Sequence, residues 1–121
     1  MLRFVLDEHL RGPLWSAIVR HNSLGGLPID ATRVGDPPDL PLGSDDSVIL
    51  LWSEREGRIL LTEDVHTMPV HLARHLQSGR HLPGIFVIGI GCSIKEILNQ
   101  LELVAHAGFA DDYADTITYI P

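Results

Sequence analysis

Paired acidic residues end two short apolar segments of this chain. Asp7 and Glu8 directly follow Leu2–Leu6. Glu63 and Asp64 follow a second apolar run near the middle of the sequence. Carboxylate oxygens are hard donors that suit Mg²⁺ or Mn²⁺. These residue types therefore favour a divalent-metal site, provided that the two segment ends lie close together in the fold.

A third acidic pair, Asp45 and Asp46, lies between the other two in the sequence. The preceding Ser44 predicts a helix N-cap, with both acids in the first turn, where the helix dipole favours negative charge. A helix that connects parallel strands runs antiparallel to them, so its first turn lies near their carboxyl ends. Functional groups gather at that edge of an α/β sheet, and we expect Asp46 to meet Asp7 and Asp64 there.

Each of these acids also has a purely structural explanation. Asp45 and Asp46 can serve only the helix N-terminus, Asp64 can be a turn residue before a cap at Thr67, and Asp7 can begin a loop. Like charges gathered at one edge repel one another unless a cation binds. The coincidence of three acids therefore favours a metal site, in which water and phosphate oxygens complete the coordination of Mg²⁺ or Mn²⁺.

Short apolar runs alternate with segments of helical length and period along the whole chain. The expected strands are Leu2–Leu6, Ile29–Val34, Arg58–Thr62, Gly84–Ile88 and Thr116–Ile120. The expected helices cover residues 13–22, 44–57 and 68–79 and the segment after a capping-box pattern at 93–96. This order predicts a three-layer α/β/α fold with a mainly parallel central sheet of about five strands.

The composition is that of one ordinary globular domain over residues 1–121, with 45% hydrophobic and 21% charged residues. No apolar stretch approaches the roughly 20 residues of a membrane span, and Asp7 interrupts the N-terminal run too early for a signal peptide. The single cysteine, Cys92, cannot form an internal disulfide, which favours the reducing cytoplasm.

The net charge of −7 argues against a general polyanion-binding surface. It does not exclude a nucleic-acid enzyme, because bound cations reverse the local charge.

Two stretches carry a family resemblance: FVLDEHLRGPL at 4–14 and SDDSVILLWSEREGRILLTED at 44–64. Together they resemble the small PIN-like family of uncharacterised prokaryotic proteins. Its members have a first strand ending Leu-Asp-Glu and a helix beginning Ser-Asp-x-x-Ile-Leu. That helix leads through Glu-Gly-Arg into a strand ending Leu-Thr-x-Asp. The resemblance covers about residues 2–90, and residues 91–121 match only a generic helix and strand.

PIN domains are metal-dependent nucleases, often the ribonuclease toxins of toxin–antitoxin pairs. The resemblance implies that Asp7, Asp46 and Asp64 are the catalytic, metal-binding acids and hold Mg²⁺ or Mn²⁺. It also implies RNA as the substrate and a cognate antitoxin as the protein partner. Asp45 is an accessory candidate, as a substitute or outer ligand. The oligomeric state stays open, with a homodimer as one alternative.

Two departures from the family pattern affect this interpretation. The family commonly continues Asp-x-Asp-Phe where this chain has His66 after Asp64, and it has Asn where this chain has His9. Either histidine is a candidate ligand, general base or phosphate contact, or simply a surface residue. The missing carboxylate supports the alternative of a catalytically weak or inactive scaffold that binds a protein partner. Glu8 matches the family, but its side chain should point away from Asp7 if the strand continues.

Two other patterns compete with this hypothesis. His71 and His75 have an i, i+4 spacing found in zinc sites, but the accompanying glutamate is missing. We expect them on a solvated helix face, opposite a buried stripe of Val70, Ala73 and Leu76. A phosphotransfer domain of receiver type requires a lysine after a late strand, whereas the only lysine lies in an expected helix.

Overall fold

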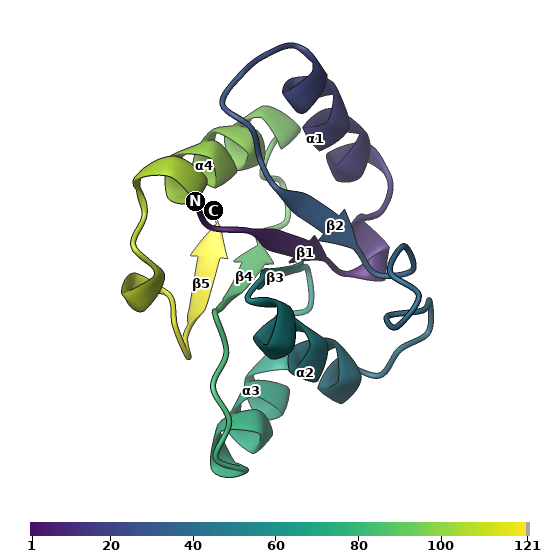
Figure 1. Ribbon diagram of the computed structural model, residues 1–121, viewed down its shortest axis with the longest axis vertical. Helices are drawn as coiled ribbons and strands as arrows, with labels where there is room; N and C mark the ends of the chain where they lie inside the picture. Colours follow the sequence, from purple (N-terminus) through teal and green to yellow (C-terminus); the bar gives the residue numbers. More distant parts are fainter. Residues whose placement is uncertain (121) are drawn as a thin grey trace.

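Five parallel strands form one central sheet in the computed structural model, which describes residues 1–120 (Figure 1). The strands are β1 (Phe4–Leu6), β2 (Ala31–Arg33), β3 (Ile59–Thr62), β4 (Ile85–Ile88) and β5 (Ile117–Ile120). Their order is β2-β1-β3-β4-β5, and each neighbouring pair is parallel. All five expected strands are confirmed, with shorter ends.

Four α-helices cover the two faces of the sheet. They are α1 (Pro13–Ser23), α2 (Asp46–Glu56), α3 (Met68–Gln77) and α4 (Ile94–Ala107), with short 3-10 helices η1 (Glu8–Leu10) and η2 (Ala110–Asp112). Figure 1 shows α1 beside α4 on one face and α2 beside α3 on the other. The three-layer α/β/α fold is therefore confirmed. Within residues 1–120, no helix has the length and apolarity needed to cross a bilayer.

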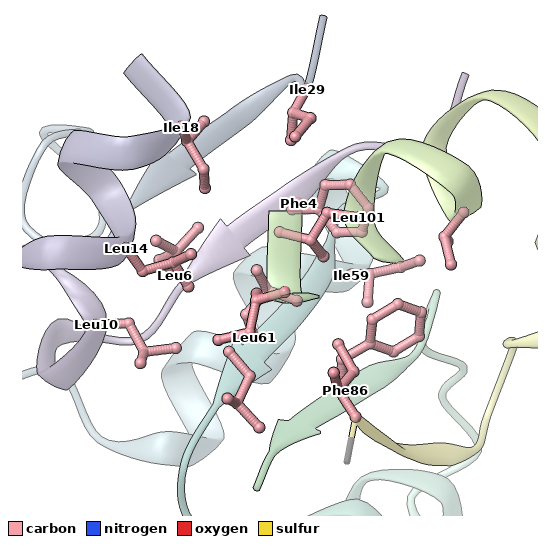
Figure 2. Close-up of a cluster of buried hydrophobic side chains, with 14 of the residues drawn as sticks. Phe4, Leu6, Leu10, Leu14, Ile18, Ile29, Ile59, Leu61, Phe86 and Leu101 are labelled. Atoms are coloured by element: carbon pink, nitrogen blue, oxygen red, sulfur yellow. The ribbon is translucent and has the colours of Figure 1, made fainter. Parts of the chain in front are cut away.

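Alternate residues of each central strand point into two separate hydrophobic cores. Phe4 and Leu6 of β1 belong to the core under α1 and α4, which Figure 2 shows, whereas Val5 belongs to the core under α2 and α3. All three side chains are fully buried. Parallel strands that are covered on both faces need such continuous apolar runs, because every side chain is buried whichever way it points.

The helix starts confirm some of the expected caps and correct others. Ser93 accepts a hydrogen bond from the Glu96 backbone N–H, as the capping box requires. Ser44 is not the N-cap of α2, since Asp45 holds that position and the Ser44 hydroxyl donates to the Pro41 carbonyl at 2.6 Å. The helix therefore begins one residue later than expected. Asp46 nevertheless begins the first turn of α2, as predicted.

The prediction for the buried face of α3 was wrong for Val70 and Ala73. It is confirmed only for Leu76, which is half-buried and packs against the core under α2 and α3. Met68, Leu72 and His75 are the buried residues, while Val70 is 51% exposed and Ala73 is also exposed. Met68 and Leu72 lie one turn apart and insert into the core under α2 and α3, which fixes the rotation of the helix. This rotation turns the histidine face of α3 towards α2.

Helix α4 carries one buried and one exposed leucine, which together allow a matched test of the core. Leu101 is fully buried among the residues of Figure 2, and Leu103 on the same helix is 61% exposed. We expect Leu101→Ala to lower the free energy of unfolding by about 2–5 kcal/mol, because it leaves a cavity. Leu103→Ala should change that free energy by less than about 0.5 kcal/mol. Urea unfolding measures both, and equal losses would contradict this arrangement of α4.

Candidate metal and active site

The strand order places a crevice between the carboxyl ends of β1 and β3. From β1 the chain moves outward to β2 on one side, and from β3 it moves outward to β4 on the other. Open α/β sheets bind ligands at such a point, where the strand order reverses. Asp7 directly follows β1, and Glu63 and Asp64 directly follow β3. Two of the three predicted acids therefore flank the reversal point of the sheet.

Asp7 is held firmly in this crevice. Leu6 pairs with Leu61 in the sheet, so the next residues along the two strands, Asp7 and Thr62, lie opposite each other. The Thr62 hydroxyl donates to Asp7 Oδ2 at 2.9 Å, and the Glu8 backbone N–H donates to Oδ1 at 2.8 Å. The Asp7 side chain is only 7% exposed. It therefore has both oxygens oriented by the protein.

Thr62 is a structural member of the site that the sequence prediction did not identify. Its Oγ1 donates to Asp7 and accepts a hydrogen bond from the Asp64 backbone N–H at 3.1 Å. Thr62 is completely buried, so these bonds satisfy a hydroxyl that has no access to water. The sequence did contain one sign of this role, since Thr62 is a polar residue at the end of an otherwise apolar strand. Thr62 thus ties together the ends of β1 and β3.

Asp64 combines a position in the crevice with a role in the following turn. Its Oδ1 accepts hydrogen bonds from the backbone N–H groups of His66 and Thr67, each at 3.0 Å. The Thr67 hydroxyl donates to the other carboxylate oxygen. These bonds hold the pKa of Asp64 below its usual range, and the bond from the Thr67 side chain has the largest effect. The turn role considered for Asp64 is therefore present in the structure.

Asp46 reaches the same region from the first turn of α2. Its Oδ2 lies 3.1 Å from Nε2 of His71 on α3. Burial raises the pKa of Asp46, and the nearby charges of Asp7, Asp64 and Asp45 raise it further, while the charge of His71 acts in the opposite direction. Asp46 is thus the carboxylate of this group whose negative charge the protein disfavours.

These side chains line an open hollow of about 530 Å³. Its lining residues are Asp7, Glu8, His9, Ser44, Asp46, Glu63 and Asp64. Glu8 faces the hollow because β1 stops at Leu6 and the chain enters η1 instead of continuing as a strand. Its carboxylate accepts a hydrogen bond from the Gly43 backbone N–H at 3.2 Å, next to the start of α2. The three predicted acids therefore share one surface.

The accessory candidates have different positions. His9 lines the hollow, whereas the exposed His66 contributes its backbone N–H to Asp64. Asp45 is exposed and lines a neighbouring groove between α2 and α3. In the part of the chain that the structure describes, no three His, Cys, Asp or Glu side chains are already gathered as a metal cluster. The acids share the hollow without converging on one point.

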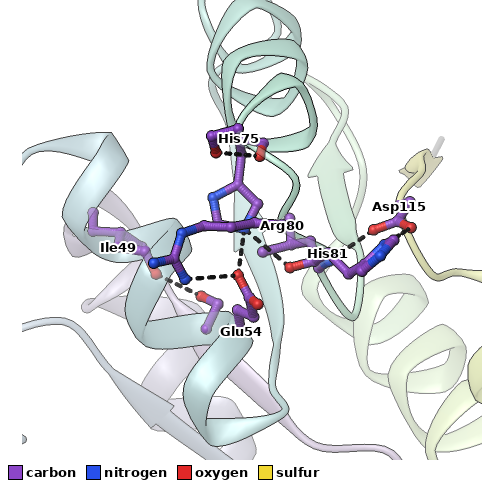
Figure 3. Close-up of polar contacts among 9 residues, drawn as sticks. Ile49, Glu54, His75, Arg80, His81 and Asp115 are labelled. Atoms are coloured by element: carbon purple, nitrogen blue, oxygen red, sulfur yellow. Dashed lines mark hydrogen bonds and ion pairs between the residues drawn. The ribbon is translucent and has the colours of Figure 1, made fainter.

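The groove between α2 and α3 carries a polar network in which His75 is buried (Figure 3). His75 Nε2 lies 2.8 Å from Glu54 Oε1 and 3.0 Å from the carbonyl oxygen of His81. The ring nitrogen is hydrogen-bonded to the carbonyl, and within residues 1–120 the buried Glu54 Oε1 has no hydrogen-bond partner. Arg80 approaches the same Glu54 oxygen at 3.6 Å. This network anchors the carboxyl-terminal half of α3 to α2.

Comparison with known proteins finds no relative: no family model matches the chain, and neither a curated protein nor a solved structure matches it significantly. The resemblance to the PIN-like family therefore stays a prediction that is based on the sequence pattern alone. The geometry of the hollow is independent of that resemblance.

The Thr62 hydroxyl supplies the first test of the site. Thr62→Val keeps the shape of the side chain but leaves an oxygen of Asp7 and the Asp64 N–H without their buried partner. We expect it to lower the free energy of unfolding by about 1–3 kcal/mol in urea. Thr118→Val, on the half-buried strand β5, is the matched control and should have a smaller effect. Equal effects of the two substitutions would contradict the linking role of Thr62.

The pair of His81 and Asp115 makes stability depend on pH. A hydrogen bond and charge attraction raise the pKa of His81 from its ordinary 6.5, and the same pair lowers the pKa of Asp115 from 3.8. The His81 contribution is full below pH 6.5 and is lost as the pH rises through its raised pKa. The Asp115 contribution is present above pH 3.8 and is lost as the pH falls through its lowered pKa.

We therefore expect His81→Gln to lower the melting temperature at about pH 6 and to have little effect at about pH 9. His66→Gln is the control, since that residue is exposed and, within residues 1–120, its ring makes no hydrogen bond, while its backbone N–H donates to Asp64. Thermal melts at the two pH values measure the difference. If His81→Gln lowers the melting temperature equally at the two pH values, the result would contradict the linkage.

Proposed function

We propose that this chain is a PIN-like, divalent-metal-dependent nuclease that hydrolyses phosphodiester bonds, with RNA as its substrate, in the cytoplasm. The observation that supports it is the position of Asp7, Asp46 and Asp64. They come from three distant segments and line one open hollow at the point where the strand order reverses. A cognate antitoxin is the protein partner that this proposal includes.

The donor set fits Mg²⁺ or Mn²⁺. All three acids offer hard carboxylate oxygens, and such ions take one or two protein carboxylates and keep several water or phosphate ligands. An open hollow leaves room for those further ligands. Asp7, Asp46 and Asp64 would hold the ion, which supplies Lewis-acid activation of water and neutralisation of phosphate charge when it is bound.

The groups of the chain divide the other tasks. Hydrogen bonds from Glu8 and Thr62 orient both oxygens of Asp7, so its carboxylate lines the hollow in a fixed position. His9 lines the hollow, where its ring can exchange a proton with a substrate oxygen. Arg11 is 3.3 Å from Asp36, so its charge is already paired within the protein. With a net charge of −7, the chain binds RNA at this hollow only when cations offset the acids.

A partner-binding scaffold without nuclease activity is the second candidate, and the contacts of Asp64 favour it. Both of its oxygens already accept hydrogen bonds from the turn that leads into α3. A histidine, His66, also stands where the family commonly has a further acid. The two candidates differ in one property: only the nuclease needs a divalent ion for its activity.

Cleavage of labelled single-stranded RNA in Mn²⁺ tests the proposal. We expect Asp7→Asn and Asp46→Asn each to lower the cleavage rate on the order of 100-fold or more, because each removes a ligand charge. Asp112→Asn, an exposed acid in η2, is the matched control and should retain the rate. Cleavage should also stop when EDTA removes the ion.

Three outcomes would contradict the nuclease. Equal cleavage by the wild type and both site variants would identify a contaminating enzyme. Cleavage that persists in EDTA would exclude a role for the ion. A wild-type protein that is folded by circular dichroism and cleaves no RNA with Mg²⁺ or Mn²⁺ would support the scaffold.

A further inference from the structure

We propose that His71 of α3 is a further metal ligand of the acidic hollow, so that the site binds Mn²⁺ through an imidazole nitrogen together with carboxylate oxygens. This inference rests on the proposed metal-dependent function and deepens it, since it assigns a ligand and a metal preference. His71 lies outside the two stretches, residues 4–14 and 44–64, whose motifs carry the resemblance to the PIN-like family.

The separation of the donor atoms supports this assignment. His71 Nε2 lies 3.1 Å from Asp46 Oδ2. Two neighbouring ligands of an octahedral ion with bonds of about 2.1 Å lie about 3.0 Å apart. The nitrogen and the oxygen are therefore separated by the distance that two adjacent ligands of one ion would have.

The packing of α3 holds His71 in this position. Met68 and Leu72 on either side of it are buried against the sheet, and one turn later His75 is anchored beside Glu54 of α2. These contacts leave the α3 helix little freedom to rotate. The His71 side chain is 26% exposed, which leaves the ring accessible to an ion from solvent.

His71 lines the groove between α2 and α3, and Asp46 belongs to the lining of both that groove and the hollow. The ring therefore approaches Asp46 from the side of the hollow that borders α3. Residues from α2 and α3 can then share one ion, with water in the remaining positions.

The other histidines at this edge are less suited to the role. Among residues 1–120, no carboxylate oxygen lies within 4.0 Å of a ring nitrogen of His9 or His66, whereas the His71 ring has such a partner. Imidazole suits Zn²⁺ and Ni²⁺ best, and carboxylate oxygen suits both Mg²⁺ and Mn²⁺. Of these last two ions, Mn²⁺ is the transition ion and accepts a nitrogen ligand more readily than Mg²⁺. A nitrogen ligand therefore predicts stronger binding of Mn²⁺ than of Mg²⁺.

Titration of the full chain with MnCl₂ and MgCl₂ by calorimetry tests this assignment. We expect His71→Asn to weaken Mn²⁺ binding by about tenfold or more and Mg²⁺ binding much less. Electron spin-echo spectroscopy of bound Mn²⁺ should show modulation from an imidazole nitrogen in the wild type and none in His71→Asn. His66→Gln is the matched control and should keep both the affinity and the nitrogen signal. His9→Gln, whose ring lines the hollow, shows whether that histidine supplies the nitrogen instead.

The opposite result is equally well defined. If His71 only pairs with the charge of Asp46, its removal frees that carboxylate and Mn²⁺ binding becomes stronger, which would overturn the assignment. A nitrogen signal that persists in His71→Asn, or that is lost in His9→Gln, would also overturn it. Mn²⁺ binding that is lost in Asp7→Asn but unchanged in His71→Asn would leave the proposed function standing without this ligand. A folded wild type that binds neither ion would reject both.

Discussion

The parallel pairing of β1 with β3 is the constraint on which the rest of this structure depends. It brings Asp7 opposite Thr62, where a hydrogen bond of 2.9 Å joins the two strand ends, and the Asp7 N–H donates to the Leu61 carbonyl. Both strands are covered on both faces, so a shift of one residue would exchange the two cores and turn Asp7 towards the face of α1 and α4. One register therefore determines both the packing of the sheet and the position of the acid.

The fold and the meeting of the three acids could be predicted because both follow from local patterns and sheet topology. Apolar runs such as Ile59–Thr62 are recognisable without a structure, and the carboxyl ends of parallel strands share one edge. The first turn of a crossover helix lies at that edge too, which placed Asp46 correctly even though the cap moved from Ser44 to Asp45. Ser and Asp are both good N-caps, so sequence alone could not choose between them.

The orientation of α3 could not be predicted, because it depends on a residue far away in the sequence. A buried histidine needs polar partners. The His81 carbonyl takes part in the hydrogen bond of His75, and Glu54 on α2 lies 2.8 Å from the same ring nitrogen. Without that contact, Val70 and Ala73 looked like a better buried face than one containing histidines. The role of Thr62 could not be predicted for a similar reason. Its hydroxyl links two strand ends only because the fold places Asp7 and the Asp64 N–H on either side of it.

The carboxylates of the hollow differ in how well the protein stabilises their negative charge. This difference determines which of them a bound cation would stabilise most. Hydrogen bonds within the protein already stabilise the charge of Asp64, and they orient both oxygens of Asp7. The charge of Asp46 is opposed by burial and by the neighbouring acids, and the charge of His71 favours it. A fold that gathers like charges without neutralising them departs from what stability alone would select, and such departures are expected at functional sites. Asp46 and His71, at the junction of α2 and α3, are therefore where an external ion would change the energetics of the hollow most.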